Sequence, residues 1–379
     1  MVKINSISMA MQILLLVTYP VASGWAAPAI TGVIGTIQDG QTVTISGSGF
    51  GTTGPNVVLF DTFEKGTSGA NISTLTNSAD VANWTASTRL GGTVPLYTNA
   101  YALSGTKSMA IDYRVSWGSG PSLTYSNVQN SDILVSWWQY IPTNRDVPGT
   151  NNSADGGPNW KWFWIGDQND DWPWGSDYSI QCLSSTCDAS TSLGSLDDTG
   201  TPARYDGKWY NSLLSKGTWM RVTVAMKNTT SGAYVWQQEI NGSSNSVVDS
   251  VTNVVTAHSN DPWNVLVIPG FGRSDNNSVL YIDDVYVATG AGARARVEMG
   301  NASTYSASTK LAFITPTSWN SNQIKATVKQ GGFKGGETVY LFVVDASGNA
   351  SPSYGPLTLG QSSGGGQAPA PAGLNIITK

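Results

Sequence analysis

Seven tryptophans lie within one stretch, between residues 137 and 174 of the 379-residue chain. Sugar rings have apolar C–H faces that stack on flat aromatic side chains, whereas their hydroxyls need planar polar partners. The segments SWWQYIPTNRD and NWKWFWIGDQNDDWPWGSDY hold these tryptophans and are also rich in Asn, Gln, Asp and Arg. Aromatic residues edged by such groups predict a cleft that binds polysaccharide. The candidate substrate-binding residues are Trp138, Gln139, Trp160, Trp162, Trp164, Trp172 and Trp174.

The alternation of side chains along a strand divides these residues between two faces. In WKWFWI, the pattern places Trp160, Trp162 and Trp164 together, opposite Lys161, Phe163 and Ile165. In VSWWQY it places Ser136, Trp138 and Tyr140 opposite Val135, Trp137 and Gln139. A sandwich core also uses tryptophan, so about half of the seven are expected to be core residues. Trp172 and Trp174 flank Pro173 in an acidic loop, which favours ligand contact.

Four other residues could move protons if the fold brings them together. A polysaccharide lyase needs a positive group to neutralise a uronate and a Tyr, Lys or His to transfer the proton. Arg114, Tyr140, Lys161 and Tyr178 could supply these roles. The alternative is that Arg114 and Lys161 are ordinary residues of a sheet surface. The Arg-x-Glu-Leu-Arg and Gln-Ile-His motifs of alginate lyases do not occur.

Other hydrolytic chemistries lack their residues. The sole histidine is His258, and there is no Gly-x-Ser-x-Gly motif, which excludes the usual serine hydrolases and a zinc site. A retaining glycoside hydrolase needs two opposed carboxylates. The chain has only Glu64, Glu239, Glu298 and Glu337, and none lies close to another, so the Glu-x-Asp-x-x-Glu motif of laminarinase-like glucanases is absent. If the protein is an enzyme, a lyase is favoured over a glycoside hydrolase.

One acidic loop could bind a metal ion. Asp167, Asn169 and Asp171 stand at alternate positions, a spacing that suits calcium. The loop departs from the EF-hand pattern because no glycine follows and Tyr178 stands at the twelfth position. A solvated loop is the alternative. We expect no required cofactor, with calcium as the one candidate.

The N-terminus predicts export. Lys3 precedes the apolar run 13–19, and small residues around Ala22 and Ala26 offer cleavage sites for a signal peptide. In a secreted chain, Cys182 and Cys187 are expected to form a local disulfide. A net charge of −5 and the lack of a basic run argue against nucleic acid and anionic membrane as partners, and no later segment is expected to span a membrane.

The first and last parts of the mature chain resemble one family. The segments ITGV and DGQTVTISGSGFG resemble the opening of an IPT/TIG immunoglobulin-like domain. The segments SWNSNQIKATV and GETVYLFVVDASGNASPSYGPLTL are similar to its later strands. Neither part could bury two sheets alone. We therefore predict a signal peptide over residues 1–27 and one discontinuous domain built from residues 28–59 and 291–360.

The middle part resembles a second family. Residues 104–115, 217–244 and 279–287 are similar to strands of the concanavalin A-like lectin/glucanase superfamily, which implies a jelly roll of two sheets, one of them concave. The prediction is an all-β protein in which a jelly-roll sandwich, residues 60–290, is inserted into a discontinuous immunoglobulin-like sandwich. Residues 361–379 are expected to be a flexible tail.

These patterns lead to three functional hypotheses. The first is a secreted, extracellular protein that binds a polysaccharide or cell-surface glycan through a Trp-rich cleft. The second is a polysaccharide-degrading enzyme. The third is a surface adhesion or structural module whose partners include other surface modules.

Overall fold

The protein is described by a computed structural model in which every regular element is a β-strand. The described residues are 27–87, 93–114, 121–148, 160–167, 178–182, 191–194, 209–210, 216–229, 232–241, 246–255, 262–270 and 277–363. Within these ranges there is no helix that could span a membrane. The predicted all-β class is confirmed.

The smaller sandwich combines strands from both ends of the chain. Its strands are β1 (Ala29–Thr36), β2 (Thr42–Ser48), β17 (Arg296–Gly300), β18 (Leu311–Trp319), β19 (Gln323–Thr327), β20 (Thr338–Val344), β21 (Tyr354–Thr358) and β22 (Ser362–Ser363). Their order is β21-β20-β17-β18-β19-β2-β1-β22. The first half of β18 pairs with β17, and its second half pairs with β19. This strand therefore passes from the layer of β17, β20 and β21 to the layer of β19, β2 and β1.

The core of this sandwich explains why the two ends meet. Val43 and Ile45 alternate with polar residues along β2, and they pair with Ala326 and Ile324 of β19. All four side chains are buried in one apolar cluster. Neither segment could bury these faces alone. A sandwich interrupted by a large insertion is therefore confirmed, while the boundaries 28–59 and 291–360 and the IPT/TIG family stay predictions.

One glycine of the GSGFG motif shows why a side chain is excluded there. A Cβ at Gly47 would clash with the carbonyl oxygen of Ala29 and the ring of Phe50. The close approach of β1 and the packing of Phe50 both depend on this glycine.

The larger sandwich consists of two sheets. The long sheet contains β3 (Asn56–Asp61), β4 (Leu96–Thr98), β5 (Ser108–Asp112), β7 (Asp132–Tyr140), β12 (Met220–Thr229), β13 (Gly232–Asn241), β14 (Ser246–Val255) and β16 (Val279–Thr289). The facing sheet contains β6 (Leu123–Tyr125), β8 (Trp160–Asp167), β9 (Tyr178–Cys182), β10 (Thr191–Gly194), β11 (Trp209–Tyr210) and β15 (Trp263–Ile268).

The order of the long sheet is β14-β13-β12-β7-β16-β5-β4. The first half of β16 pairs with β5, and its second half pairs with β3. The order of the facing sheet is β11-β10-β9-β8-β15-β6. Residues such as Ile111, Val135 and Leu280 of the long sheet share one buried core with the facing sheet, where Trp137 stacks on Phe163 at 5.7 Å between ring centroids.

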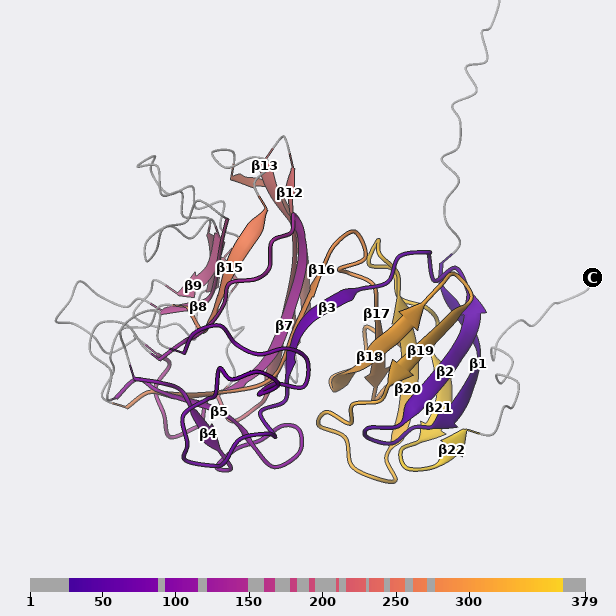
Figure 1. Cartoon of the computed structure of the whole chain (residues 1–379), viewed down its shortest axis with the longest axis horizontal. Coiled ribbons are helices and arrows are strands. Elements are labelled where there is room, and N and C mark those ends of the chain that lie inside the picture. Colours follow the sequence, from indigo (N-terminus) through magenta and orange to yellow (C-terminus); the bar gives the residue numbers. More distant parts are fainter. Residues whose placement is uncertain are drawn as a thin grey trace, which may run out of the picture.

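The smaller sandwich packs beside β3 and β16 (Figure 1). The contact is apolar in part, because Tyr286 of β16 stacks on Phe313 of β18 with ring centroids 4.0 Å apart. It is also ionic, because Arg221 of β12 forms a fully buried ion pair with Glu298 of β17. Lys329 of the smaller sandwich donates to Asp80 of the larger one at 2.7 Å. We call this contact the junction.

Candidate functional site

The outer face of the long sheet, which points away from the facing sheet, has two differently covered ends. On β7, Val135 and Trp137 share a face, as the alternation predicts, and this face belongs to the core. The outward residue Leu134 packs into the apolar cluster of the junction. Further along the same face Tyr140 is half-buried rather than covered. We call the part around Leu134 the covered end and the part around Tyr140 the open end.

Four aromatic rings gather at the open end, and we call them the aromatic patch: Tyr101, Tyr140, Trp219 and Tyr281. The ring of Tyr101 lies 4.7 Å from that of Tyr140 and 4.8 Å from that of Tyr281. The rings of Tyr140 and Trp219 are 5.4 Å apart. Tyr101 is 37% exposed and the other three are half-buried, so solvent reaches the patch.

Regular strand pairing positions three of these rings. Tyr140 of β7 and Tyr281 of β16 are direct partners in the antiparallel register, which puts them on the same face. Trp219 immediately precedes Met220, the residue of β12 that pairs with Gln139. The patch is therefore built on the outer face of three neighbouring strands of the long sheet, β12, β7 and β16.

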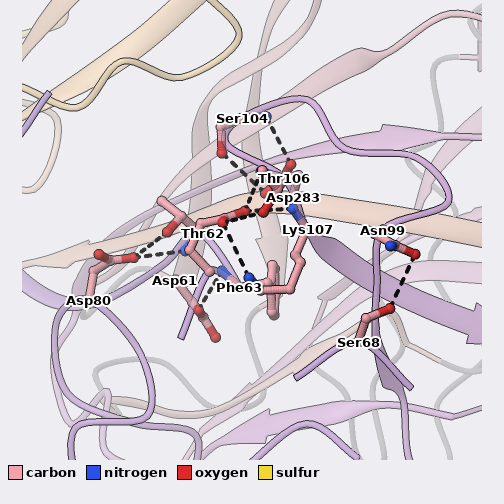
Figure 2. A network of polar contacts seen from close by, with 11 residues as sticks. Asp61, Thr62, Phe63, Ser68, Asp80, Asn99, Ser104, Thr106, Lys107 and Asp283 are labelled. Atoms are coloured by element: carbon pink, nitrogen blue, oxygen red, sulfur yellow. Dashed lines mark hydrogen bonds and ion pairs between the residues drawn. The ribbon is translucent and has the colours of Figure 1, made fainter. Parts of the chain in front are cut away.

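Tyr101 comes from a loop, and the buried side chain of Asp283 and the half-buried side chain of Glu64 hold that loop in place. Asp283 of β16 accepts hydrogen bonds from the backbone N–H groups of Leu103 and Ser104 at 2.8 and 3.1 Å. Glu64 accepts from the N–H groups of Thr106 and Lys107 at 2.8 and 2.6 Å. Figure 2 shows this network, in which Asp283, Ser104, Thr106 and Lys107 lie close together. The loop that carries Tyr101 is thus tied to the long sheet.

A pocket of about 720 Å³ opens beside the patch. Val94, Leu96 and Val279 supply apolar walls. Among the described residues, the polar and charged ones that line it are Asn71, Thr93, Asp112, Arg114, Arg145 and Tyr281. Tyr281 belongs to both the pocket and the aromatic patch, so one ligand can contact both.

The charged groups of the pocket are ordered by hydrogen bonds. Arg114 donates to Asp112 through Nε at 2.8 Å and through Nη2 at 2.6 Å. Burial alone would raise the pKa of Asp112, but the hydrogen bonds and the charge of Arg114, together with the charge of Arg145, hold it below its ordinary value. Arg145 donates through Nη1 to the side-chain oxygen of Asn277 at 3.0 Å.

Tyr140 and Tyr281 of the patch have raised pKa values and are neutral phenols at neutral pH. Burial is the main cause that raises the pKa of Tyr281, and the neighbouring Tyr101 adds to it against the charges of Arg145 and Arg114. Burial and Tyr101 also raise the pKa of Tyr140. Both hydroxyls can therefore donate and accept hydrogen bonds.

The predicted binding residues that the structure describes are all buried, but they lie in different parts of the larger sandwich. Trp138 is on the outer face but only 4% exposed, and Gln139 is buried, accepting a hydrogen bond from the indole of Trp137 at 3.1 Å. Trp160 is fully buried in the core and donates to the hydroxyl of Tyr113 at 3.2 Å. Trp164 packs with Val265 and Val267 in a separate small cluster.

The prediction that Trp160 and Trp164 share a face is wrong. The pairing of β8 with β9 shifts by one residue between Lys161 and Phe163. Such an irregularity reverses the alternation beyond it. Trp160 therefore joins Phe163 and Ile165 in the core, and Trp164 lies in a different cluster.

Of the predicted catalytic residues, Arg114 and Tyr140 both flank Tyr281 at the open end. Arg114 follows β5, whose residue Ala110 pairs with Tyr281. Lys161 and Tyr178 have their backbones in β8 and β9 of the facing sheet, in the other layer of the sandwich. The fold thus brings two of the four onto one face of the long sheet.

Several predictions fall on residues outside the description. These are the residues Trp172, Trp174, Asn169, Asp171 and Cys187, together with the side chains of Lys161, Trp162, Asp167, Tyr178 and Cys182. Among the described residues no group of three or more His, Cys, Asp or Glu side chains could hold a metal ion. The calcium loop and the disulfide therefore stay predictions.

The sequence reasoning missed Tyr101, Trp219, Tyr281 and Arg145. For Tyr281 a signal existed, because Leu280 and Ile282 on either side of it are apolar and alternation would place it on the opposite face. Tyr101 and Arg145 lie in loops, where no periodic signal exists.

Comparisons with known proteins give distant structural likeness only. No family model matches the sequence, and no curated protein matches it. Similar solved structures include the alginate lyase Aly36B, with a TM-score of 0.41 and 14% identity over 62% of this chain and 97% of that one. An endo-β-1,4-glucuronan lyase from the fungus Trichoderma reesei has a TM-score of 0.39 and 14% identity over 59% and 96%. The PL-14 alginate lyase from Aplysia kurodai has a TM-score of 0.39 and 9% identity over 52% and 87%. We therefore argue the function from the residues of this chain.

Proposed function

We propose that the larger sandwich binds polysaccharide at the open end of the long sheet. The observation that carries the proposal is the aromatic patch, in which four solvent-accessible rings lie together beside a pocket of about 720 Å³. Aromatic side chains supply flat apolar surface for the C–H faces of sugar rings. The polar groups of the pocket supply partners for sugar hydroxyls.

The aromatic patch replaces the Trp-rich cleft as the proposed platform. Among the described tryptophans of the 137–174 stretch, Trp137 and Trp160 are core residues and Trp138 and Trp164 are at most 5% exposed. The patch also favours glycan binding over a purely structural or adhesive role. Strand pairing holds the rings of Tyr140 and Tyr281 in place before a ligand binds, which lowers the entropic cost of binding. The export predicted from the N-terminus would bring this face into contact with extracellular glycans.

A second candidate is cleavage of the bound chain by β-elimination. It is favoured by the presence of Arg114 and Tyr140 on either side of Tyr281. In that reaction a base removes the proton on the carbon next to the carboxylate. The β C–O bond then breaks, a C=C bond forms, and an acid protonates the departing oxygen. The raised pKa values of Tyr140 and Tyr281 suit the acid role better than the base role, so we place binding first.

Affinity electrophoresis on a panel of polysaccharides tests the proposal with the full chain. We expect the wild-type protein to be retarded by at least one polymer, and the Tyr101→Ala/Tyr140→Ala variant to lose about tenfold or more in affinity. Tyr340→Ala is the matched control, because Tyr340 is a half-buried strand tyrosine of the smaller sandwich. Wild-type retention in the double variant would refute the platform.

The same samples separate binding from cleavage. Ultraviolet absorbance of an unsaturated product, or new reducing ends, would establish the second candidate. Retardation without either product supports a binding protein.

A further inference from the structure

We infer that the pocket beside the aromatic patch binds one anionic substituent of the sugar chain, a carboxylate or a sulfate ester, and that Arg145 is the residue that recognises it. This inference rests on the proposed function and adds the charge of the ligand to it. Nothing in the aromatic patch itself selects a charged sugar. An experiment can therefore refute the anion subsite at Arg145 and leave polysaccharide binding by the patch intact.

Arg145 carries the inference because its charge is not compensated by a direct ion pair. A guanidinium has five N–H donors. Within the part of the chain that the structure describes, the side chain of Arg145 donates to the Asn277 amide oxygen through Nη1, and no carboxylate forms an ion pair with it. An amide oxygen is a neutral acceptor, so the positive charge stays available to a ligand in the pocket that Arg145 lines.

Arg114 provides the contrast within the same pocket. Its guanidinium makes two hydrogen bonds to Asp112, and the pair neutralises itself. The described residues that line the pocket include two arginines and one aspartate, which leaves one positive charge in excess among them. That excess is a local exception in a chain whose net charge is −5. A single anionic group is the ligand that this charge balance fits.

The position of Arg145 is set by the fold rather than by the ligand. It closes a turn directly after β7, with its N–H donating to the carbonyl of Pro142 at 3.0 Å. Asn277, which precedes β16, donates to the carbonyl of Asn144 at 3.3 Å and accepts from the N–H of Asp146 at 3.3 Å. The turn is therefore tied to the start of the strand that carries Tyr281. Such preorganisation lowers the entropic cost of binding.

Tyr281 links the anion subsite to the platform. It lines the pocket and is 4.8 Å from the ring of Tyr101. A sugar that stacks on the patch can thus present a substituent to Arg145 without a second contact surface. We expect the subsite to distinguish acidic from neutral glycans, and the patch to supply affinity for both.

The test uses the full chain and three forms of one polysaccharide: a polyuronate, its carboxyl-reduced neutral form and a sulfated derivative of that neutral form. Affinity is measured for the wild type, Arg145→Gln, Arg145→Lys and Lys325→Gln. The Lys325 variant changes the net charge by the same amount at an exposed site of the smaller sandwich. Equal thermal unfolding of all four proteins shows that they are folded.

We expect the wild type to bind an anionic form about tenfold or more tighter than the neutral form. Arg145→Gln should lose that preference and keep its affinity for the neutral form, Arg145→Lys should keep part of it, and Lys325→Gln all of it. Whichever anionic form is preferred identifies the substituent.

Equal binding of all three forms by the wild type, or an unchanged preference in Arg145→Gln, would overturn the anion subsite. The proposed function would then stand on the Tyr101→Ala/Tyr140→Ala result. Failure of every form to bind would overturn both.

Discussion

The covered and open ends of the long sheet's outer face are built from the same strands but differ in what packs against them. Tyr286 and Tyr281 both lie on β16 and both point to this face. Tyr286 is fully buried against Phe313 of the smaller sandwich, whereas Tyr281 is half-buried and lines a pocket. The difference comes from what packs on them. An aromatic residue on a strand becomes core or binding surface according to its neighbours in space.

A bulge in β16 brings the two tyrosines onto one face. They are five residues apart, and strict alternation would put them on opposite faces. The pairing of β16 with β7 is irregular between Asp283 and Tyr286, where Asp284 has a φ of 48°. The extra residue resets the alternation. The two ends therefore meet at the bulge, next to the carboxylates that hold the Tyr101 loop.

The largest effect is expected from removal of the buried charge at the covered end. Glu298 accepts from Arg296 and Tyr305 and pairs with Arg221. Burial alone would raise its pKa, but the charges of Arg221 and Arg296 hold the pKa below its ordinary value. Glu298→Ala leaves both arginines buried without their counter-ion, which we expect to cost about 3–5 kcal/mol in the free energy of unfolding by urea.

Glu337→Ala is the control for Glu298→Ala. It removes a partly exposed ion pair with Lys310, at 2.9 Å, and is expected to cost less than about 1 kcal/mol. Similar losses in the two variants would contradict the idea that the junction depends on a buried charge network.

Exchanging the two tyrosines of β16 for alanine separates stability from binding. Tyr286→Ala removes a ring that contacts both Phe60 and Phe313, and we expect a loss of about 3–5 kcal/mol in stability. Tyr281→Ala removes a half-buried ring, with a loss of about 1 kcal/mol in stability and about tenfold in glycan affinity. Urea unfolding and affinity electrophoresis on the same two variants measure both. If Tyr281→Ala were the less stable variant, the distinction between the two ends would be lost.

A further effect concerns pH and two buried carboxyl groups. Burial is the main cause that raises the pKa values of Asp61 and Asp284 from 3.8 to about 7. The folded protein therefore holds these protons after the unfolded chain has released them. Their contribution to stability is full below about pH 4 and is lost as the pH rises through about 7.

We therefore expect the free energy of unfolding to fall by on the order of 5 kcal/mol between about pH 5 and about pH 8, about half of it from each carboxyl. Asp284→Asn should reduce this slope, whereas Glu337→Gln, a change to a surface carboxyl, should not. A stability that rises with pH over this interval would show that the two buried carboxyls are ionised in the folded protein.

Regular strands made part of the fold predictable. The alternation of β7 correctly put Val135 and Trp137 on the face opposite Tyr140, and the structure shows that the face of Val135 and Trp137 is the core face. Val43 and Ile45 of β2 likewise indicated a strand with one apolar face, and the segment around Ile324 indicated another strand of the same domain, with which the structure pairs it. These inferences succeeded because side-chain direction in a strand has a period of two, whatever the strand packs against.

The candidate site was predictable only in part. Arg114 and Tyr140 were named from their types and do lie at the open end, but they were named together with Lys161 and Tyr178 of the other sheet. The tryptophan cluster indicated aromatic crowding, and it did not reveal that Trp160 is a core residue. Residue type predicts which groups can contact a sugar and leaves their exposure undetermined.

The sequence by itself determined the strands, the two-sandwich organisation and the chemical types available for a site, because local alternation and composition carry that information. The tertiary structure alone decided which aromatic rings reach solvent. Exposure depends on bulges in β8 and β16, on the loop held by Glu64 and Asp283, and on the smaller sandwich that covers one end of the outer face. Each of these is a contact between residues far apart in the chain, and no local pattern encodes it.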